Sequence, residues 1–376
     1  MISSFHYSCS MGKNKRLSEF SIYRERVEDA LQRALPKQAE FPWQADAFGA
    51  LPDCIRKNHI APLLEPCRSL LLSGGKRWRP ILLLLCAELA RQSGRTGGVD
   101  ADGADALTPL VEFVHMASLI HDDIEDSSET RRGRPAAHIT YGVDAALNAG
   151  SWLYFAAASC IEACAAGAEF KNTLYALYTK ELRRLHLGQA MDISWHRSPN
   201  AFPTVEEYAA MVHCKTGTLA SLAVQTGLLA GGASPAEAAA AGCIAEALGE
   251  GFQILDDVQN LTTGNPGKER GDDIIEGKKS FPLLLHIKNC PQDKKRLSAY
   301  LKSAAKKGTG ATAAASIEQC IALLESSGAT AAAAERGRSL VEENSRLLSD
   351  IFGTRNSAPA ARKIEQLFAA MLPEGA

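Results

Sequence analysis

Two apolar segments of the chain each run into a pair of aspartates, and this pattern limits the fold more than any other feature. The first is LTPLVEFVHMASLIHDDIED, residues 107–126, and the second is GFQILDDVQN, residues 251–260. Both have the composition of helices that pack in a core. Carboxylates crowded at a helix end raise one another's pKa unless a cation is present. Each acidic end is therefore either a hydrated helix terminus or a site that holds a cation.

Helix signals recur along the rest of the chain. Thr204 with Glu207, and Ser234 with Glu237, have the spacing of a capping box at two helix starts. Glycine- and proline-rich breakers lie near residues 91–105, 196–203 and 262–272, and alternating β-branched runs are scarce. The sequence therefore predicts an all-α, single-domain bundle of ten or more helices.

Composition excludes several classes of protein. The 41 basic and 43 acidic residues leave a formal charge of −2, which offers no electrostatic basis for binding nucleic acid. The ten cysteines include no C-x-x-C pair, so zinc and dithiol redox sites are disfavoured and free thiols in a reducing cytosol are expected. No apolar run approaches the roughly 18 residues of a membrane span. We expect a cytoplasmic protein with no membrane span.

The N-terminus lacks the apolar core of a signal peptide, and Met11 is a second candidate start. We expect residues 1–10 to be disordered. Residues 1–40 are predicted to form a partly disordered extension, and residues 41–376 to form the domain.

Metal binding is the first chemical hypothesis. In a helix, Asp122 and Asp126 point the same way, and Asp123 points about 100° round. Carboxylate oxygens on one face suit Mg²⁺, which keeps several waters and takes further oxygens from phosphates. Asp256 begins the second cluster, with Asn260 on the same face. One cluster alone is equally well explained as a hydrated helix end, but two favour a pair of sites that clamp two or three Mg²⁺ around a diphosphate.

Basic residues near these clusters could supply the rest of an anion site. Taken singly, each is better explained as a solvated side chain, but together they suffice for two diphosphates. The set comprises Lys76, Arg77, Arg79, Arg131, Arg132, Lys215, Lys268 and Lys278, with the hydroxyl of Thr216. From spacing alone, His115 is better explained as a core histidine. Gln189 and Asp192 share a helix face as buried polar groups or as groups near a substrate.

Six segments then match a known family. GGKRWRP, VHMASLIHDDIEDSSETRRGRPAAH, LGQAMD, KTG, GFQILDDVQN and GKKSFP occur in this order between residues 60 and 290. They resemble the trans-isoprenyl diphosphate synthases, and most of all the geranylgeranyl diphosphate synthases of eukaryotic type. The resemblance implies a helical bundle around a deep central cavity, usually as a homodimer. It also implies Mg²⁺-dependent, head-to-tail condensation of isopentenyl diphosphate with an allylic diphosphate.

The resemblance also implies roles for single residues. The implied metal ligands are Asp122, Asp126 and Asp256, which are implied to be catalytic together with Lys215. The implied isopentenyl diphosphate pocket comprises Lys76, Arg79, His115 and Arg132. The implied allylic pocket comprises Arg131, Lys215, Thr216, Gln253, Asn260, Lys268 and Lys278. His115 thus becomes a ligand, while Asn260 departs from the aspartate that many relatives carry.

Product length is expected to depend on the helix upstream of Asp122, because each turn rises 5.4 Å, roughly one isoprene unit. Short-chain synthases that resemble this chain block the tunnel there with an aromatic residue, whereas Ser118 and Ala117 are small. Val114 and Val111 lie deeper, and Trp152, Tyr154 or Phe155 could form the floor. We expect the twenty-carbon product, all-trans geranylgeranyl diphosphate, with farnesyl or longer polyprenyl diphosphates as alternatives.

Two other functions remain open. A terpene cyclase shares an aspartate motif and an all-α fold, but it has no need of a second diphosphate pocket built from Lys76, Arg79 and His115. A non-catalytic helical partner subunit would usually lose an aspartate motif, and both are intact here.

Overall fold

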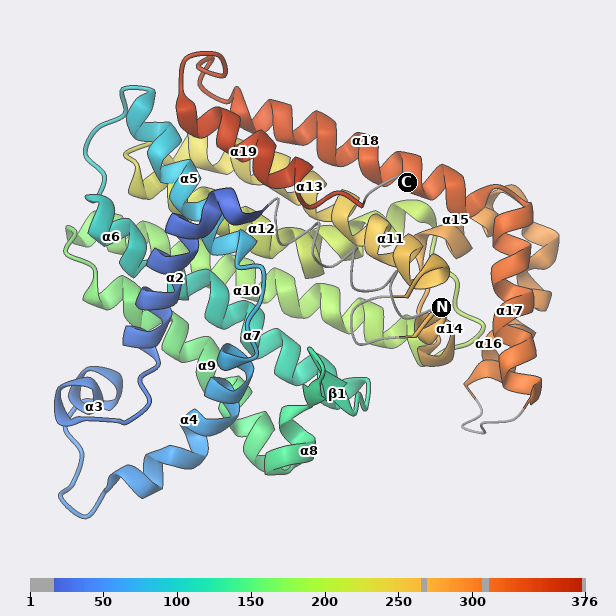
Figure 1. The fold of residues 1–376 in the computed structure, drawn as a ribbon, viewed down its shortest axis with the longest axis horizontal. Coiled ribbons are helices and arrows are strands. Elements are labelled where there is room, and N and C mark those ends of the chain that lie inside the picture. Colours follow the sequence, from blue (N-terminus) through green and yellow to red (C-terminus); the bar gives the residue numbers. More distant parts are fainter. Residues whose placement is uncertain (1–16, 265–268, 306–310, 374–376) are drawn as a thin grey trace. The chain divides into compact units, whose positions relative to one another are not determined.

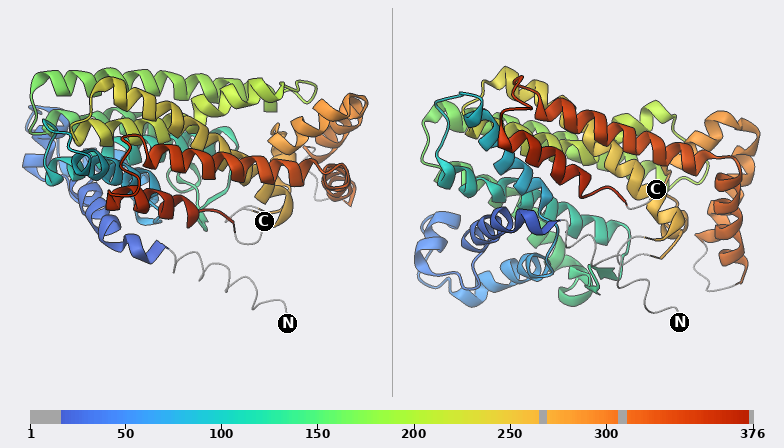
Figure 2. Two further views of the ribbon diagram at one scale, coloured as in Figure 1. Left: turned by 90° about the horizontal axis from the view of Figure 1, so that it is seen from above. Right: turned by 45° about the horizontal axis from the view of Figure 1, so that its top comes forward.

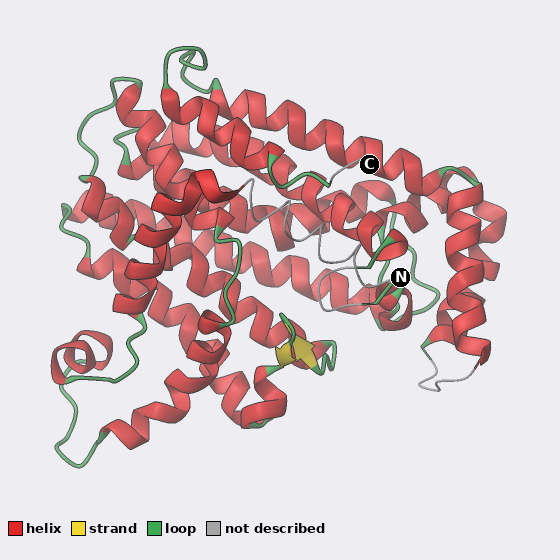
Figure 3. Ribbon diagram, viewed as in Figure 1, coloured by secondary structure: helices red, strands yellow, loops and turns green. Residues whose placement is uncertain are grey.

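The computed structural model describes residues 17–264, 269–305 and 311–373 (Figure 1). Helices dominate, as Figure 3 shows, and strands occur in the described residues only as the short antiparallel pair β1 (Thr130–Arg131) and β2 (Arg134–Pro135). The predicted all-α fold with more than ten helices is confirmed. No helix among these residues is long and apolar enough to cross a membrane.

Packing divides the chain into two compact units whose segments alternate in the sequence. Unit 1 comprises Met1–Thr179, Leu222–Gly242 and Leu348–Leu372, and unit 2 comprises Lys180–Ser221, Cys243–Leu347 and Pro373–Ala376. The divisions fall inside four helices, which are α10 (Ala168–His196), α12 (Thr218–Ala230), α13 (Pro235–Thr262) and α18 (Ala329–Ser349). The predicted 1–40 and 41–376 boundary and the central cavity remain predictions, and residues 1–16 lie outside the described part of the chain.

Unit 1 is built around α7 (Thr108–Glu125), which lies along α9 (Val143–Ala163) (Figures 1 and 2). Its core includes the apolar run Ile81–Leu85 of α5 (Trp78–Gln92), every residue of which is buried, so this run belongs to a core helix. The unit's other elements are η1 (Leu17–Phe20), α2 (Ser21–Ala34), α3 (Phe41–Phe48), α4 (Lys57–Leu72), α6 (Ala101–Ala106), α8 (Ala137–Tyr141) and α19 (Pro359–Ala369).

Unit 2 has a separate apolar core, in which Tyr208, Phe281 and Leu297 are buried together. Ile254 and Val258 of α13 belong to the same core, so the second acidic segment packs against helices that precede and follow it in the sequence. The elements of this unit are α11 (Val205–Val212), the turn η2 (His213–Gly217), α14 (Asp272–Glu276), α15 (Phe281–Asn289), η3 (Pro291–Asp293), α16 (Lys294–Ala304) and α17 (Ala311–Ser326).

Both predicted capping boxes are present. The Thr204 hydroxyl accepts from the backbone N–H of Glu207 at 3.1 Å, and the Glu207 carboxylate accepts from the backbone N–H of Thr204 at 2.7 Å. Ser234 and Glu237 make the same reciprocal pair at 3.3 and 2.8 Å. These bonds satisfy N–H groups that the first helical turn leaves without partners. The starts of α11 and α13 are therefore encoded locally.

The predicted breaker at 91–105 is partly wrong, because it contains α6. The Asp100 carboxylate accepts from the backbone N–H of Gly103 at 2.8 Å and caps this short helix. The breaker at 196–203 is confirmed, and the described part of 262–272 contains a turn after α13 ends at Thr262.

Candidate functional site

The end of α7 carries the first acidic cluster. The backbone N–H of Asp126 donates to the carbonyl of Asp122 at 2.8 Å, so the helical turn continues and both carboxylates lie on one side of it. Asp123 is buried and accepts from Nε of Arg131 at 2.8 Å. Burial raises the pKa of Asp123, and the Arg131 guanidinium opposes that rise. Asp123 is thus buried and bound to a protein side chain, whereas Asp122 and Asp126 are partly exposed.

The second cluster, in α13, divides its two aspartates in the same way. Asp256 is exposed, whereas Asp257 is buried and accepts from the Tyr208 hydroxyl and the Phe281 backbone N–H, each at 2.7 Å. Gln253 adds a third hydrogen bond at 3.1 Å. Burial raises the pKa of Asp257 to about 7. In both clusters the first aspartate reaches the surface of its unit and the second is held by protein groups.

A group of cationic side chains surrounds His115 in unit 1. Burial, together with the charges of Arg79 and Arg132, holds the pKa of His115 well below its usual range, so its imidazole is neutral. Burial also lowers the pKa of Arg79 to about 10, and its Nε has no hydrogen-bond partner among the described residues. Arg132 donates to the carbonyl of Gly74, and Lys76 is exposed in the same loop. The buried, unpaired Arg79 nitrogen makes this group suited to an anion.

The turn η2 between α11 and α12 is π-helical, because the backbone N–H of Thr218 donates to the carbonyl of His213. Lys215 and Thr216 lie within this turn. Lys215 Nζ donates to Asp192 at 2.6 Å, and the Thr216 hydroxyl donates to Oε1 of Gln253 at 3.0 Å. The wide turn therefore brings two predicted allylic residues into contact with α10 and α13.

Asp192 interacts with two of the predicted allylic lysines, Lys215 and Lys278. Burial alone would raise the pKa of Asp192, but the charges of Lys215 and Lys278 bring it below the usual value. Lys278 also pairs with Glu276 at 2.7 Å. A Cβ on Gly188 would lie 2.4 Å from the backbone nitrogen of Lys215, so α10 approaches this closely only because the residue is glycine. From the sequence, Asp192 could be either a buried polar group or a group near a substrate.

Asn260 and Lys268 complete the predicted allylic set. Asn260 is fully buried, and its Oδ1 accepts from the backbone N–H of Asp273 at 3.3 Å, which helps hold the start of α14. Its contact with a diphosphate stays a prediction. Lys268 lies outside the described residues.

The residues predicted to set product length lie along α7. Ala117 and Val114 are buried, while Ser118 is partly exposed and its hydroxyl donates to the carbonyl of His115 at 2.8 Å. None of the three carries a ring or a long side chain. A cavity beside them remains a prediction.

The three aromatic residues proposed for the tunnel floor differ in their surroundings. Tyr154 is buried, with its ring centroid 5.5 Å from that of His121. Trp152 stacks on Phe48 of α3, with centroids 6.1 Å apart. Phe155 is 78% exposed. The suggestion that Phe155 could close the tunnel is therefore wrong, because its ring does not line the interior of unit 1.

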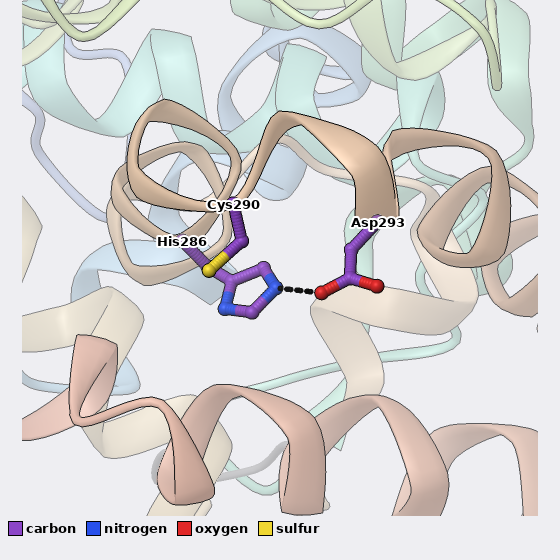
Figure 4. A group of neighbouring side chains, drawn as sticks. All are labelled: His286, Cys290 and Asp293. Carbon is purple, nitrogen blue, oxygen red and sulfur yellow. Dashed lines mark hydrogen bonds and ion pairs between the residues drawn. The ribbon is translucent and has the colours of Figure 1, made fainter.

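A group of three possible metal ligands lies at the corner between α15 and α16: His286, Cys290 and Asp293 (Figure 4). The His286 ring is buried, and its nitrogens lie 3.1 Å from Asp293 Oδ2 and 2.8 Å from the Ser327 hydroxyl. Both ring nitrogens thus have protein partners, as expected for a structural histidine.

Glu112 and the role of Arg77 were not predicted from the sequence. Glu112 is the one acidic residue inside the apolar run LTPLVEFVH and lies three positions before His115. It is buried and pairs with Arg77 at 2.6 Å. An acid placed inside a core helix, on the side of a predicted ligand, is the signal that could have identified it.

Comparisons with known proteins agree with these features. Residues 61–321 match the family model described as polyprenyl synthetase. A geranylgeranyl pyrophosphate synthase of Rhodocybe pseudopiperita is 38% identical over 215 residues, covering 55% of this chain and 60% of that protein. A geranylgeranyl pyrophosphate synthase of Macrophomina phaseolina is 31% identical over 308 residues, covering 81% of this chain and 88% of that protein.

The fold also matches that of solved enzymes. The crystal structure of geranylgeranyl pyrophosphate synthetase from Pyrococcus horikoshii Ot3 is similar, with a TM-score of 0.75 and 25% identity over 96% of this chain and 98% of that one. The sequence matches to the first three curated relatives span only 53–60% of their lengths.

Proposed function

The chain belongs to the polyprenyl synthetase family, and from this premise we propose that it condenses isopentenyl diphosphate with an allylic diphosphate to give all-trans geranylgeranyl diphosphate. The observation that carries this proposal is that the two acidic clusters place their aspartates in the same two environments. In each, one aspartate is anchored by protein groups and the other reaches the surface. The names of the relatives support the twenty-carbon product.

The acidic residues fit a hard divalent cation. Asp122, Asp126 and Asp256 offer only carboxylate oxygens, the donors that Mg²⁺ prefers. Two or three bound Mg²⁺ ions would neutralise the allylic diphosphate and make it a better leaving group. Asp123 and Asp257, held by their own hydrogen bonds, keep the two ligand-bearing turns in place.

Other residues of the chain bind and orient the substrates. The proposed ligands of the allylic diphosphate are Arg131 in unit 1 and Lys215, Thr216, Gln253 and Lys278 in unit 2. In the proposed isopentenyl pocket, Lys76, Arg79 and Arg132 bind the second diphosphate, and neutral His115 can donate one N–H without adding charge to the arginines.

The proposed reaction forms one carbon–carbon bond. The allylic C–O bond breaks and diphosphate leaves. The double bond of isopentenyl diphosphate attacks the resulting carbocation, and a proton is then lost, with the departing diphosphate as the base. The pockets supply proximity and orientation, which can contribute roughly 7–11 kcal/mol in favourable cases.

Turnover with sized products tests this function. The protein is expected to consume isopentenyl diphosphate with dimethylallyl, geranyl or farnesyl diphosphate in the presence of Mg²⁺, and to release a twenty-carbon prenyl diphosphate. EDTA should stop turnover, and added Mg²⁺ should restore it. A cyclic hydrocarbon made without isopentenyl diphosphate would indicate a terpene cyclase, and absence of turnover would indicate a binding protein or partner subunit.

We also propose a homodimer, in the cytosol. Four apolar side chains along α8 and α9 remain exposed in the single chain: Ile139, Val143, Leu147 and Phe155. Exposed large apolar side chains on two helices that contact each other are typical of an interface. The described cysteines form no disulfide, as expected for a reducing compartment.

Phe155→Asp is expected to convert the dimer into a monomer, because it places a charge in the apolar contact. Light scattering after size exclusion measures the mass directly. Phe41→Asp is the matched control, since Phe41 on α3 is 79% exposed, as Phe155 is 78% exposed, but is not among those four side chains. A wild-type monomer, or equal effects of both variants, would contradict this interface.

A further inference from the structure

The loop before α5 is held by one buried arginine to which none of the roles above applies. We propose that Arg77 is a positioning residue that holds Lys76 and Arg79 in the pose that receives the isopentenyl diphosphate, and that Glu28 of α2 tunes that pose. This inference rests on the proposed function. It extends the site beyond the matched family region, because Glu28 precedes residue 61.

Each nitrogen of the Arg77 guanidinium has a hydrogen-bond partner, and the side chain has no exposed surface. Nε donates to Glu28 at 2.8 Å, Nη1 donates to Glu112 at 2.6 Å, and Nη2 donates to the carbonyl of Leu71 at 2.8 Å. These partners lie on α2, α7 and α4. One side chain therefore ties three helices of unit 1 to the loop that carries the predicted ligands.

The backbone of this loop depends on that contact. Arg77 has a φ of 52°, in the left-handed region that residues other than glycine seldom adopt. It is the N-cap of α5, yet no side-chain hydrogen bond caps the helix there. Such a conformation persists only when its surroundings over-determine it. Here the two glutamates do so, and the directions of Lys76 and Arg79 follow from this backbone.

Arg132 depends on the same loop. It donates to the carbonyl of Gly74, and a Cβ on Gly75 would lie 3.1 Å from its guanidinium. The loop thus packs against the Arg132 guanidinium. A shift of Arg77 would therefore also move Arg132, another predicted ligand of the isopentenyl diphosphate.

Arg77 also neutralises a buried acid next to the anion site. Glu112 is 2% exposed, and its charge acts on both Arg79 and Arg132. Without Arg77, this carboxylate would compete with a diphosphate for those two arginines and repel the diphosphate. Arg77 therefore acts through charge as well as through position.

Glu28→Gln provides the mildest test. The Glu28 side chain is 27% exposed, so the amide has access to water, and Arg77 keeps its pair with Glu112. We expect KM for isopentenyl diphosphate to rise about fivefold, because one charged hydrogen bond is weakened. The kcat and the KM for farnesyl diphosphate should stay within about twofold, because the allylic pocket is not altered.

Arg77→Gln should raise the same KM about thirtyfold, because both ion pairs are lost. The double variant Arg77→Gln, Glu112→Gln should then recover part of that loss, because it removes the unpaired carboxylate. A purely structural role would lower the fraction of folded protein, and hence kcat, without this recovery of KM.

Asp105→Asn is the matched control, because it breaks the ion pair that Arg26 of α2 makes at 2.8 Å and leaves Arg77 intact. An equal rise in KM for Asp105→Asn and Glu28→Gln would overturn the proposal, since docking of α2 would then explain both. So would a Glu28→Gln protein whose kcat falls while KM stays constant.

Calorimetric binding of inorganic pyrophosphate to wild type and both Arg77 variants separates this inference from the proposed function. Weaker binding in Arg77→Gln, recovered in the double variant, would support the positioning role even if the wild type made no prenyl diphosphate. Equal binding in all three proteins would overturn it.

Discussion

Asp122→Asn is expected to lower kcat about a thousandfold, because a carboxylate that holds a catalytic cation contributes several kcal/mol to the transition state. The amide keeps the shape of the side chain but removes its charge. Asp126, on the same side of the turn, would be left as the single predicted anionic ligand at the end of α7. Turnover of isopentenyl diphosphate with farnesyl diphosphate at saturating Mg²⁺ measures the loss.

The same substitution should leave the fold intact or stabilise it. Asp122 lies in the last turn of α7, where the helix dipole disfavours negative charge and Asp126 adds repulsion. Removing one charge should therefore hold or raise Tm measured in EDTA. Activity and stability are expected to change in opposite directions.

Glu129→Gln serves as the control for this prediction, because Glu129 is an exposed acid seven residues later with no predicted role. Its activity should stay within about twofold of wild type, as for most exposed positions. If Asp122→Asn retained more than a tenth of wild-type activity, Asp122 would not be a metal ligand.

Ala117→Phe is expected to shift the main product from twenty carbons to fifteen. Ala117 lies five residues, about 7.5 Å, before Asp122 along α7. If the product extends along this helix, a phenyl ring there would fill the space that the fourth isoprene unit needs. Product sizing with dimethylallyl diphosphate as primer should show the fifteen-carbon species in excess.

The outcome separates a tunnel from a packed core. Ala117 is fully buried, so a ring inserted into a solid core would destabilise the fold by about 1–3 kcal/mol and leave product length unchanged. Met116→Phe is the control, because it places a ring one position, about 100°, around the helix without increasing volume as much. If Ala117→Phe lowered Tm and left the product unaltered, the tunnel assignment would be contradicted.

Much of the fold could be predicted from the sequence because its signals are local. The capping pairs at Thr204 and Ser234 specify helix starts through bonds that span three residues. The acidic ends of α7 and α13 were visible as composition. By contrast, α6 was not predicted, because its segment is rich in glycine and aspartate and has the composition of a loop. The Asp100 carboxylate nevertheless caps a short helix there.

What could not be predicted depends on partners distant in sequence. Helical spacing separated Asp123 from Asp122 and Asp126, but the contact of Asp123 with Arg131 could not be read from the sequence. Phe155 looked like a buried aromatic, but its direction on α9 is set by tertiary packing. The partners of Arg77 are Glu28, 49 positions earlier, and Glu112, 35 positions later, and no helical or strand periodicity predicts contacts over such separations.

The π-helical turn at His213–Gly217 has a consequence for how this region can vary. Such a turn contains one more residue than a regular helical turn. The side chains of α12 therefore point in directions that differ from those they would have if α11 continued as a regular α-helix. Deleting one residue there would restore regular helix and rotate everything on one side by about 100°. Either the Lys215 pair with Asp192 or the packing of α12, every residue of which is buried, would then be lost. This turn should therefore tolerate changes of side chain far better than changes of length.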